Sequence, residues 1–516
     1  MATVVKSFAV EGINGFFVEI EATTIRGQQQ AISIIGLGDQ AVKESGERIQ
    51  AALEHCGYDI PKDKVVISLA PGDKRKRGSH YDLGMIIGLL QQTDQIAAKN
   101  LEDVAFIGEI SLNGKLRPCN GILPMVTEAK RVGVKTIVLP EANCSEASKI
   151  SGIDVIGFEK LKDVVKYLES GVVPERKDDN VEVGEIKSTS DIDFADVRGQ
   201  NELIEAIVLA AAGGHNILMV GTPGCGKTMI ASRIPTILPT MTEQESLEVT
   251  KLHSIAGTIE AGHDLIKKRP FRSPHHNVSL NALIGGGTYA QPGEVSLAHN
   301  GVLFLDELAE FTRGTLDALR QPLEDKKVTI SRVNGTNSYP ANFMLVSAMN
   351  PCPCGYYPTS KCRCSDYEVL HYRGKISGPI LERIDIQKDV KNINYFELGD
   401  EDVAPSSAEL RLMVEKARAI QNERYKDDDK VSCNAQMTTG QIKQYCILDA
   451  ESKTLMKKVC EDRGYSARVI HKLLRMARTA ADLDGMENIT INHVRKVLNC
   501  RDLDKSNGKM YVVGKM

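Results

Sequence analysis

The stretch Gly221-Thr-Pro-Gly-Cys-Gly-Lys-Thr228 decides the fold of this chain, because it completes a phosphate-binding loop. The apolar run 216–220 before it has the length of a strand, and a helical pattern begins at Met229. In this context, backbone N–H groups and the helix dipole bind nucleotide phosphates. We expect Lys227 to reach the outer phosphates and Thr228 to bind Mg²⁺, so the sequence predicts a protein that binds ATP or GTP. The loop residues are Gly221, Thr222, Pro223, Gly224, Cys225, Gly226, Lys227 and Thr228.

Two later strand-like runs end in polar side chains that suit nucleotide hydrolysis. Val302-Leu-Phe-Leu305 is followed by Asp306 and Glu307. We expect Asp306 to lie near Mg²⁺ and Glu307 to polarise the attacking water. The run 343–349 is followed by Asn350, whose neutral amide can hydrogen-bond the γ-phosphate and the water.

Two arginines are candidates for contacts with the nucleotide. Arg383 lies between apolar residues in Ile380-Leu-Glu-Arg-Ile-Asp385, and Arg468 begins a helical segment of the tail. Such an arginine is usually solvated or paired on a helix surface. In a ring ATPase, Arg383 can instead reach the γ-phosphate of the neighbouring subunit, and Arg468 can fold back on the nucleotide.

These residues occur in the order of an AAA+ ATPase, and four phrases resemble the magnesium-chelatase-like ComM (YifB) family. The resemblance spans essentially the whole chain. It implies ATP and Mg²⁺ as cofactors and places the family's nucleotide roles on Lys227, Thr228, Asp306, Glu307, Asn350, Arg383 and Arg468. The phrases are Arg269-Pro-Phe-Arg-Ser-Pro-His-His276, the segment Gly293–Glu307, Leu319-Arg-Gln-Pro-Leu-Glu324 and Ala348-Met-Asn-Pro-Cys-Pro-Cys-Gly355.

We expect an α/β protein of three domains and a linker. The first 170 residues alternate strand-like and helical runs, and resemble the proteolytic domain of Lon in segments 108–118 and 129–140. The expected divisions are a Lon-like domain at 1–170, a polar linker at 171–191, an AAA+ core with a parallel sheet at 192–400 and a helical lid at 401–510. The lid helices are expected at 410–424, 439–445, 450–463, 467–483 and 492–500.

The Lon-like domain is expected to lack proteolytic activity. A protease of this type needs a serine nucleophile activated by a lysine. By the resemblance, His80 stands in place of the serine and Pro124 in place of the lysine, while the neighbouring Ser79 has no evident lysine partner. The related domain of the recombination protein RadA suggests a docking or nucleic-acid-contacting platform instead.

Four cysteines lie close together directly after Asn350. Cys352, Cys354, Cys362 and Cys364 could form a complete tetrahedral thiolate set for a structural Zn²⁺. The alternative is a flexible loop of free thiols. Cys225, inside the phosphate loop, is expected to be a small filler rather than a nucleophile.

The overall charge excludes a globally basic DNA-binding protein. Lysine and arginine number 64 against 68 acidic residues, which gives a net charge of −4. Basic runs occur locally, and each is either a solvated surface or part of a positive channel that a ring of subunits would concentrate. These are Lys74-Arg-Lys-Arg77, Lys267 to Arg272 and the residues Lys326, Lys327 and Arg332, which border a predicted hairpin turn at Asn334-Gly335 near an expected insertion at 280–297.

Composition predicts a cytoplasmic protein without a membrane segment. Twelve cysteines without a secretory leader favour a reducing compartment. The longest apolar runs are far shorter than the roughly 20 residues that a bilayer requires.

The favoured function is that of a ring-forming, ATP-dependent DNA helicase or branch-migration translocase in homologous recombination and natural transformation. The resemblance implies single-stranded or branched DNA and recombination proteins as partners, with an ATP-dependent hexamer. The alternative is a chelatase-type ATPase subunit that drives Mg²⁺ insertion into a porphyrin. The Lon-like domain, the cysteine loop and the lack of an Asp-x-Ser-x-Ser motif weigh against it. An ATP-dependent protease is a third reading, disfavoured by His80 and Pro124.

Overall fold

The computed structural model describes residues 2–27, 31–98, 101–173, 192–259, 265–288, 290–332, 335–392, 404–428 and 431–505. The chain divides into two compact units. The first unit comprises Met1–Gly184 and Glu243–Ile266, and the motor unit comprises Glu185–Thr242 and Lys267–Met516. Most of the expected linker (from residue 174) and Asn334 of the expected hairpin turn lie outside the described residues.

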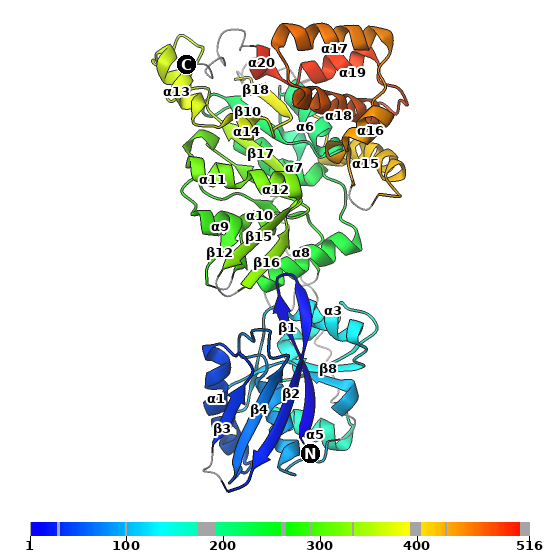
Figure 1. The fold of residues 1–516 in the computed structure, drawn as a ribbon. Coiled ribbons are helices and arrows are strands. Elements are labelled where there is room, and N and C mark those ends of the chain that lie inside the picture. The colour runs from blue at the N-terminus through cyan, green and yellow to red at the C-terminus, as the bar shows by residue number, and fades with distance from the viewer. Residues whose placement is uncertain are drawn as a thin grey trace. The chain divides into compact units, whose positions relative to one another are not determined.

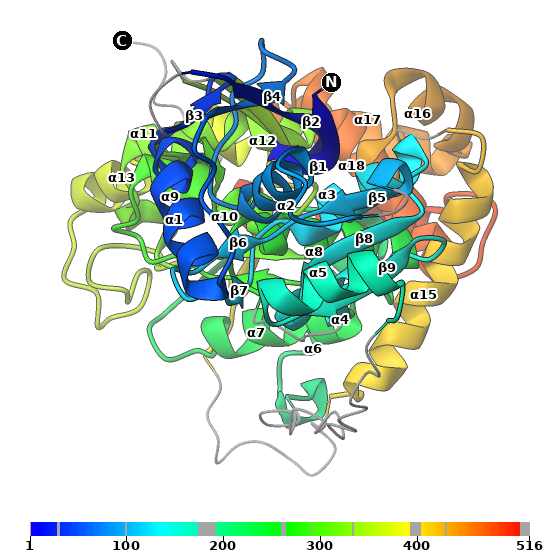
Figure 2. The same ribbon diagram turned by 90° about the horizontal axis from the view of Figure 1, so that it is seen from below.

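The first unit is built on a mixed sheet of seven strands in the order β3-β4-β2-β1-β5-β8-β9. The long strands β1 and β2 pair antiparallel, whereas β1, β5, β8 and β9 run parallel. Figure 2 shows β5, β8 and β9 side by side. The strands are β1 (Thr3–Glu11), β2 (Asn14–Ile25), β3 (Ile32–Ile35), β4 (Lys64–Ala70), β5 (Val104–Phe106), β8 (Thr136–Pro140) and β9 (Asp154–Phe158), with a separate pair β6 (Glu109–Ile110) and β7 (Leu116–Arg117).

Helices cover both faces of this sheet and form two apolar clusters. Side chains alternate between the two faces of a strand, so residues of β1 that point to opposite faces join different clusters. Val5 packs with α1, α2 and α5, whereas Phe8 packs with α3 and α4. The helices are α1 (Gln40–Cys56), α2 (Asp82–Gln92), α3 (Ile122–Val132), α4 (Cys144–Ala147), α5 (Leu161–Ser170) and α8 (Glu243–Ile255).

Helix α8 packs in the first unit, although the sequence analysis placed its residues inside an AAA+ core at 192–400. Leu247 packs against the apolar cluster around α3. Ser254 Oγ donates to Glu146 Oε1 at 2.5 Å and accepts from the backbone N–H of Gly121 at 3.1 Å. Burial raises the pKa of the Glu146 carboxyl. A segment within the expected AAA+ span therefore belongs to the first unit.

The motor unit contains the parallel sheet that the sequence predicts, with five strands in the order β11-β14-β17-β10-β18. All of its strand pairs are parallel, and β10, β14 and β17 are buried along their whole length. Continuous apolar burial is typical of a parallel sheet covered on both faces. The strands are β10 (Ile217–Gly221), β11 (Phe271–Arg272), β14 (Val302–Leu305), β17 (Met344–Met349) and β18 (Ile386–Val390).

The remaining elements of this part form short helices and hairpins around the sheet (Figure 1). The helices are α6 (Asn201–Gly213), α7 (Lys227–Ile237), α9 (Leu280–Ile284), α10 (Glu294–Leu297), α11 (Arg313–Ala318), α12 (Arg320–Asp325), α13 (Asp366–Gly374) and α14 (Gly378–Leu381). The short strands are β12 (Gly285–Gly286), β13 (Gln291–Pro292), β15 (Lys327–Arg332) and β16 (Gly335–Pro340).

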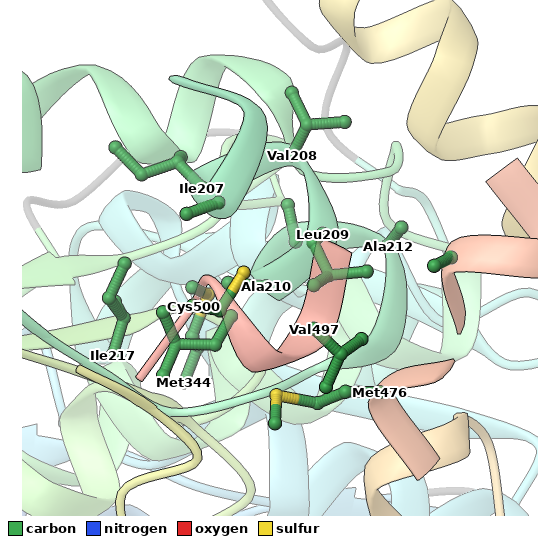
Figure 3. Packing of buried hydrophobic residues seen from close by; sticks show 14 of the residues in the cluster. Ile207, Val208, Leu209, Ala210, Ala212, Ile217, Met344, Met476, Val497 and Cys500 are labelled. Atoms are coloured by element: carbon green, nitrogen blue, oxygen red, sulfur yellow. The ribbon is translucent and has the colours of Figure 1, made fainter. Parts of the chain in front are cut away.

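The C-terminal helices pack on α6 and complete the core of the motor unit. Figure 3 shows Ala210 and Ala212 of α6 among Met476, Val497 and Cys500 from the C-terminal segment. Alanines on α6 permit close packing of these larger side chains. Helices α15 to α19 confirm the five helices expected in the tail, and the short α20 is an addition. Their bounds are α15 (Ser407–Arg424), α16 (Thr439–Tyr445), α17 (Ala450–Arg463), α18 (Ala467–Leu483), α19 (Ile491–Leu498) and α20 (Asp502–Lys505).

In the described part of the chain, no helix is both long enough and apolar enough to span a membrane.

Candidate nucleotide-hydrolysis site

The phosphate loop connects β10 to α7, as the motif predicts. Two glycines in the loop have positive φ angles, 80° at Gly224 and 89° at Gly226, which glycine adopts without strain. The ammonium group of Lys227 is buried and donates to the backbone oxygens of Gly221 (2.7 Å) and Thr222 (3.0 Å). The buried Thr222 Oγ1 has no hydrogen-bond partner among the described residues. The loop therefore presents a lysine and a hydroxyl suited to an anionic ligand, and these residues fit a nucleotide.

The parallel sheet brings the predicted polar residues to the end of β10. Strands β14 and β17 are neighbours of each other, and β17 is also a neighbour of β10. Because parallel strands end at one edge, Asp306 and Asn350 reach the start of α7. Thr228 Oγ1 donates to Asp306 Oδ2 at 2.7 Å, and Lys227 Nζ donates to Asn350 Oδ1 at 3.3 Å. A hydroxyl beside a carboxylate is an oxygen set that suits Mg²⁺.

Glu307 has a backbone conformation that is uncommon for a residue with a side chain. Its φ and ψ are 52° and 47°, a left-handed conformation that costs about 1–2 kcal/mol. Its backbone N–H donates to Asp306 Oδ1 at 2.9 Å. Its side chain is 52 % exposed, so its carboxylate stays accessible to water. The backbone at this position holds the acid at the surface rather than in the core.

His276 contacts Glu307 and was not identified as a site residue from the sequence. His276 Nδ1 lies 3.1 Å from Glu307 Oε2, and its ring packs edge-on against Phe311. His276 follows β11, which pairs with β14, so the sheet brings it to the residue after Asp306. His276 lies in the segment Arg269–His276, one of the four that resemble the family, and this resemblance could have marked it as a site residue.

The four predicted cysteines converge. One sulfur atom from each of Cys352, Cys354, Cys362 and Cys364 lies within 4.8 Å of the others. Backbone N–H groups of Arg363 and Tyr356 lower the pKa of the Cys354 thiol to about 6, which favours its thiolate. Four thiols at these separations fit a tetrahedral metal site, because thiolates are the ligands that Zn²⁺ prefers. All twelve cysteines of the chain are free of disulfides.

Arg383 and Arg468 line the same cavity, whose volume is about 780 Å³. Arg383 forms an ion pair with Glu324, and its Nε is buried without a hydrogen-bond partner among the described residues. Arg468 Nη1 lies 2.8 Å from Glu382 Oε2, and its side chain is 61 % exposed. Other basic residues of the lining are Lys326, His471, Lys472 and Arg475. The structure therefore groups the two arginines, while their expected roles remain predictions.

A buried carboxylate fixes the floor of this cavity. Asp385 Oδ1 lies 2.8 Å from Lys472 Nζ, and its Oδ2 lies 3.4 Å from His215 Nδ1 and accepts from the backbone N–H of Asn216 at 3.2 Å. Burial raises the pKa of the Asp385 carboxyl, but Lys472 and His215 outweigh it and hold the pKa well below its ordinary value. This network ties α18 to β10 and β18.

The predicted hairpin is present and packs on the predicted insertion. Strands β15 and β16 pair antiparallel from Lys327 to Arg332. Arg332 Nη2 donates to Asn281 Oδ1 of α9 at 2.8 Å, and Tyr339 Oη donates to the backbone oxygen of Ala290 at 2.9 Å. Lys326 differs from the expectation: it is half-buried at the base of the hairpin and lines the cavity of Arg383.

The expected basic surface Lys74-Arg-Lys-Arg77 is wrong in part. Lys76 is fully buried and donates to backbone oxygens of Pro71 and Lys74, and burial lowers its pKa. Lys74 Nζ pairs with Glu11 at 2.8 Å and lies over the ring of Phe16. The sequence has four adjacent basic residues, but Lys76 points into the interior and the charge of Lys74 is balanced by Glu11.

The position expected for a Lon-type nucleophile holds an inert histidine. His80 is half-buried, and desolvation of its ring lowers its pKa to about 4, so the ring is neutral near pH 7. Its Nε2 has no partner among the described residues. Ser79 Oγ donates to Glu109, which is not the lysine that a Ser–Lys protease requires.

Family models of the magnesium-chelatase subunit ChlI match most of the chain. The model described as magnesium chelatase, subunit ChlI, matches residues 193–398; that of subunit ChlI of Mg-chelatase matches 20–143, and that of the ChlI C-terminal part matches 404–501.

Full-length relatives give the same result. The chain is 36 % identical over 501 residues to competence protein ComM of Haemophilus influenzae, covering 96 % of this chain and 97 % of the relative. It is 37 % identical over 505 residues to YifB of Escherichia coli, covering 98 % and 97 %. Lon protease 2 of Bacillus subtilis is 27 % identical over 197 residues, which cover 35 % of each chain. Family models and relatives together show that the chain belongs to the ComM/YifB family of magnesium-chelatase-like AAA+ proteins.

Proposed function

We propose that this protein is a ring-forming, ATP-dependent DNA helicase or branch-migration translocase that acts in homologous recombination and natural transformation. The observation that carries the proposal is the constellation at the phosphate loop, where Thr228 meets Asp306 and Lys227 meets Asn350. This constellation supports a nucleotide motor. The name of the Haemophilus relative, a competence protein, supports a role in the uptake of DNA.

ATP hydrolysis is assigned to residues of the described site. Lys227 and the N–H groups of the loop would bind the outer phosphates, and Thr228 with Asp306 would hold Mg²⁺. An ion held there would supply positive charge to offset the charge that develops on the phosphate oxygens. Asn350 orients the γ-phosphate, and Glu307 accepts the proton of the attacking water. The exposed carboxylate of Glu307 and its contact with His276 support this assignment.

In a ring, Arg383 and Arg468 could act on the nucleotide of a neighbouring subunit. Arg383 and Arg468 share one basic cavity, and within the described residues their hydrogen bonds go to Pro379, Glu324 and Glu382 rather than to the phosphate loop. In a hexamer assembled by ATP, this cavity faces the γ-phosphate of the next subunit, and both arginines stabilise the transition state there. Their carboxylate partners, Glu324 and Glu382, hold them until that contact forms.

The DNA track is assigned to the hairpin β15–β16 together with the packed insertion at α9. Lys327 and Arg332 are exposed on this hairpin. Within a ring, each exposed cation is repeated in every subunit, so an acidic chain still presents a positive channel. We assign Lys326 to the nucleotide cavity rather than to the track.

We also propose that the four cysteines hold one structural Zn²⁺ per chain and that the protein is cytoplasmic. The convergence of the four sulfur atoms supports the zinc, and the absence of disulfides among the twelve cysteines agrees with a reducing compartment. Metal analysis of protein purified without added zinc tests the site. About one zinc per chain is expected, and none would leave a loop of free thiols.

A chelatase motor that drives Mg²⁺ insertion into a porphyrin is the second candidate. The ChlI family models favour it, because they are named for a magnesium-chelatase subunit. The first unit with its Lon-like sequence and the four-cysteine loop favour the DNA motor.

The deciding experiment is a strand-displacement assay on forked and four-way DNA junctions with ATP and Mg²⁺. We expect labelled strands to be released by the parent protein and not by Glu307→Gln, which binds ATP without hydrolysing it. A Lys327→Ala variant should bind DNA more weakly, with a log-affinity against log-salt slope flatter by about 0.9 per lost duplex contact. A parent protein that hydrolyses ATP and displaces no strand would favour the chelatase candidate.

A further inference from the structure

The cysteine loop, defined as residues 352–364, touches the phosphate loop at one glycine. Gly355 has a φ of +85°, and a Cβ placed on it would lie 2.6 Å from Cδ and 2.7 Å from Cγ of Pro223. Carbon atoms in favourable contact are about 3.5–4.0 Å apart, so only a glycine fits against this ring. The backbone of the cysteine loop therefore forms a wall of the phosphate loop.

The cysteine loop is anchored next to the nucleotide site. It follows Asn350 after a single residue, Pro351, and Asn350 Oδ1 accepts from Lys227 at 3.3 Å. It ends at α13, where the buried Arg373 donates from Nε to the backbone oxygen of Pro351 at 3.0 Å. A movement of the loop would therefore reach Pro223 through Gly355 and Lys227 through Asn350.

The loop itself contains turns but no helix or strand. Its backbone is therefore not ordered by a ladder of hydrogen bonds, and the thiols at its interior form only weak S–H contacts. Cys352 is fully buried, with its sulfur 3.4 Å from that of Cys354 and 3.8 Å from that of Cys362. A cation held by four thiolates would cross-link the loop and fix its path.

We propose that the cysteine loop is a metal-dependent latch on the phosphate loop. A soft divalent cation such as Zn²⁺, held by Cys352, Cys354, Cys362 and Cys364, keeps Gly355 against Pro223 and Asn350 beside Lys227. The ATP site is then ordered before the nucleotide arrives. The latch rests on the zinc site proposed above, and it makes metal loading a condition for tight ATP binding.

The test changes the contact between Gly355 and Pro223 while leaving the four metal-binding thiols in place. Gly355→Ala keeps all four thiols but forces a methyl group into Pro223. Gly133→Ala is the matched control, because Gly133 has the same φ of +85° and a Cβ there would meet nothing within 4 Å. The dissociation constant of a fluorescent ATP analogue with Mg²⁺, and the zinc content, are measured for each. We expect Gly355→Ala to retain zinc and bind the analogue about tenfold more weakly, a change of about 1.4 kcal/mol. Gly133→Ala should bind like the parent.

A second arm uses the unaltered protein and guards against a folding defect in the variant. Stripping the metal with a strong thiol-competing chelator should weaken binding of the analogue by a similar factor, and adding Zn²⁺ should restore it. Zinc-loaded Gly355→Ala that binds like the parent would overturn the latch, as would metal-free parent protein with full affinity. A protein that never contains metal would overturn the latch and the zinc site together. No DNA is present, so these outcomes are independent of whether the motor moves on DNA.

Discussion

The two units of this protein differ in what their sequences retain. In the motor unit, Lys227, Thr228, Asp306 and Asn350 are brought within hydrogen-bond reach by the ends of parallel strands. In the first unit, the resemblance to Lon predicts that a half-buried neutral histidine, His80, stands in place of the nucleophile, and that Pro124, buried in α3, stands in place of the lysine. The predicted residues for nucleotide hydrolysis converge in the motor unit, whereas no serine–lysine pair is found near Ser79 and His80 among the described residues of the first unit.

This difference shows that an activity is inferred from a site rather than from a fold. The first unit resembles a protease domain, yet within its described residues Ser79 donates to Glu109 and not to a lysine. Its helix α8 comes from within the sequence that the resemblance assigned to the AAA+ core.

The largest expected effects come from the two residues that separate binding from hydrolysis. Lys227→Ala should abolish nucleotide binding, because the ammonium group contacts ground-state phosphates. Glu307→Gln should keep binding and lower kcat by about 10²–10⁴-fold, as expected for a lost general base. Equilibrium binding and steady-state hydrolysis check both. A Glu307→Gln protein with the parent rate would remove Glu307 from the site.

The next effect tests whether the motor needs a neighbour. Arg383→Ala should lower hydrolysis by about 10³-fold, since an arginine finger contributes 10³–10⁵. Mixing Arg383→Ala subunits with Lys227→Ala subunits should restore part of the rate, because an interface with one intact site and one intact arginine then forms. Proven mixed rings without any recovery would show that Arg383 serves only its pair with Glu324.

Stability of the motor unit should depend on the buried carboxylate at the cavity floor. Asp385→Asn leaves Lys472 buried without its counter-charge, and we expect a loss of about 3 kcal/mol in the free energy of unfolding. Chemical denaturation measures the loss. Because Asp385 joins α18 to β10, hydrogen exchange in α18 should rise with it. Unchanged stability would mean that water replaces the ion pair.

The first unit should show a pH effect that comes from His80. The pKa of His80 falls from its ordinary value of 6.5 to about 4 on folding, so the unfolded chain binds the proton more tightly. Its contribution to stability is full above pH 6.5 and is lost as the pH falls toward 4, by about 3 kcal/mol in total. Hydrogen exchange in α2, compared between the parent and His80→Phe across this range, measures it. An equal pH dependence in both would contradict the burial of a neutral ring, and ATP hydrolysis at neutral pH should not change.

The smallest effect concerns the residue that holds the hydrolytic acid. His276→Ala should lower kcat by about tenfold with an unchanged KM, because it positions Glu307 and does not touch the nucleotide. His276→Gln, which can still hydrogen-bond the carboxylate, should recover part of the rate. A change in KM alone would place His276 in binding instead.

The sequence predicted the motor unit well because its signals are local. The phosphate loop, the strand that ends at Asp306 and the strand that ends at Asn350 are each short runs, and the rule for parallel strands brings their ends together. The four cysteines are close in sequence, so their convergence in space could also be predicted. The tail helices were readable from helical spacing and from capping residues such as Ser466.

Features that depend on distant contacts were missed. The pairing of His276 with Glu307 requires β11 to lie beside β14, which no local pattern specifies. The burial of Lys76 inside a basic run and the turn of Lys326 into the arginine cavity are set by tertiary packing. Similarly, nothing near Ser254 in sequence indicates that it bonds Glu146 in the first unit.

We propose that DNA drives the ATPase cycle of the motor unit. The most direct measurement is the steady-state rate of ATP hydrolysis with and without forked DNA, at fixed salt and saturating ATP with Mg²⁺. The account predicts that forked DNA raises the rate of the parent protein several-fold and leaves Glu307→Gln inactive in both conditions. An equal rate with and without DNA, in protein shown to form rings, would contradict the account and return the motor to the chelatase class.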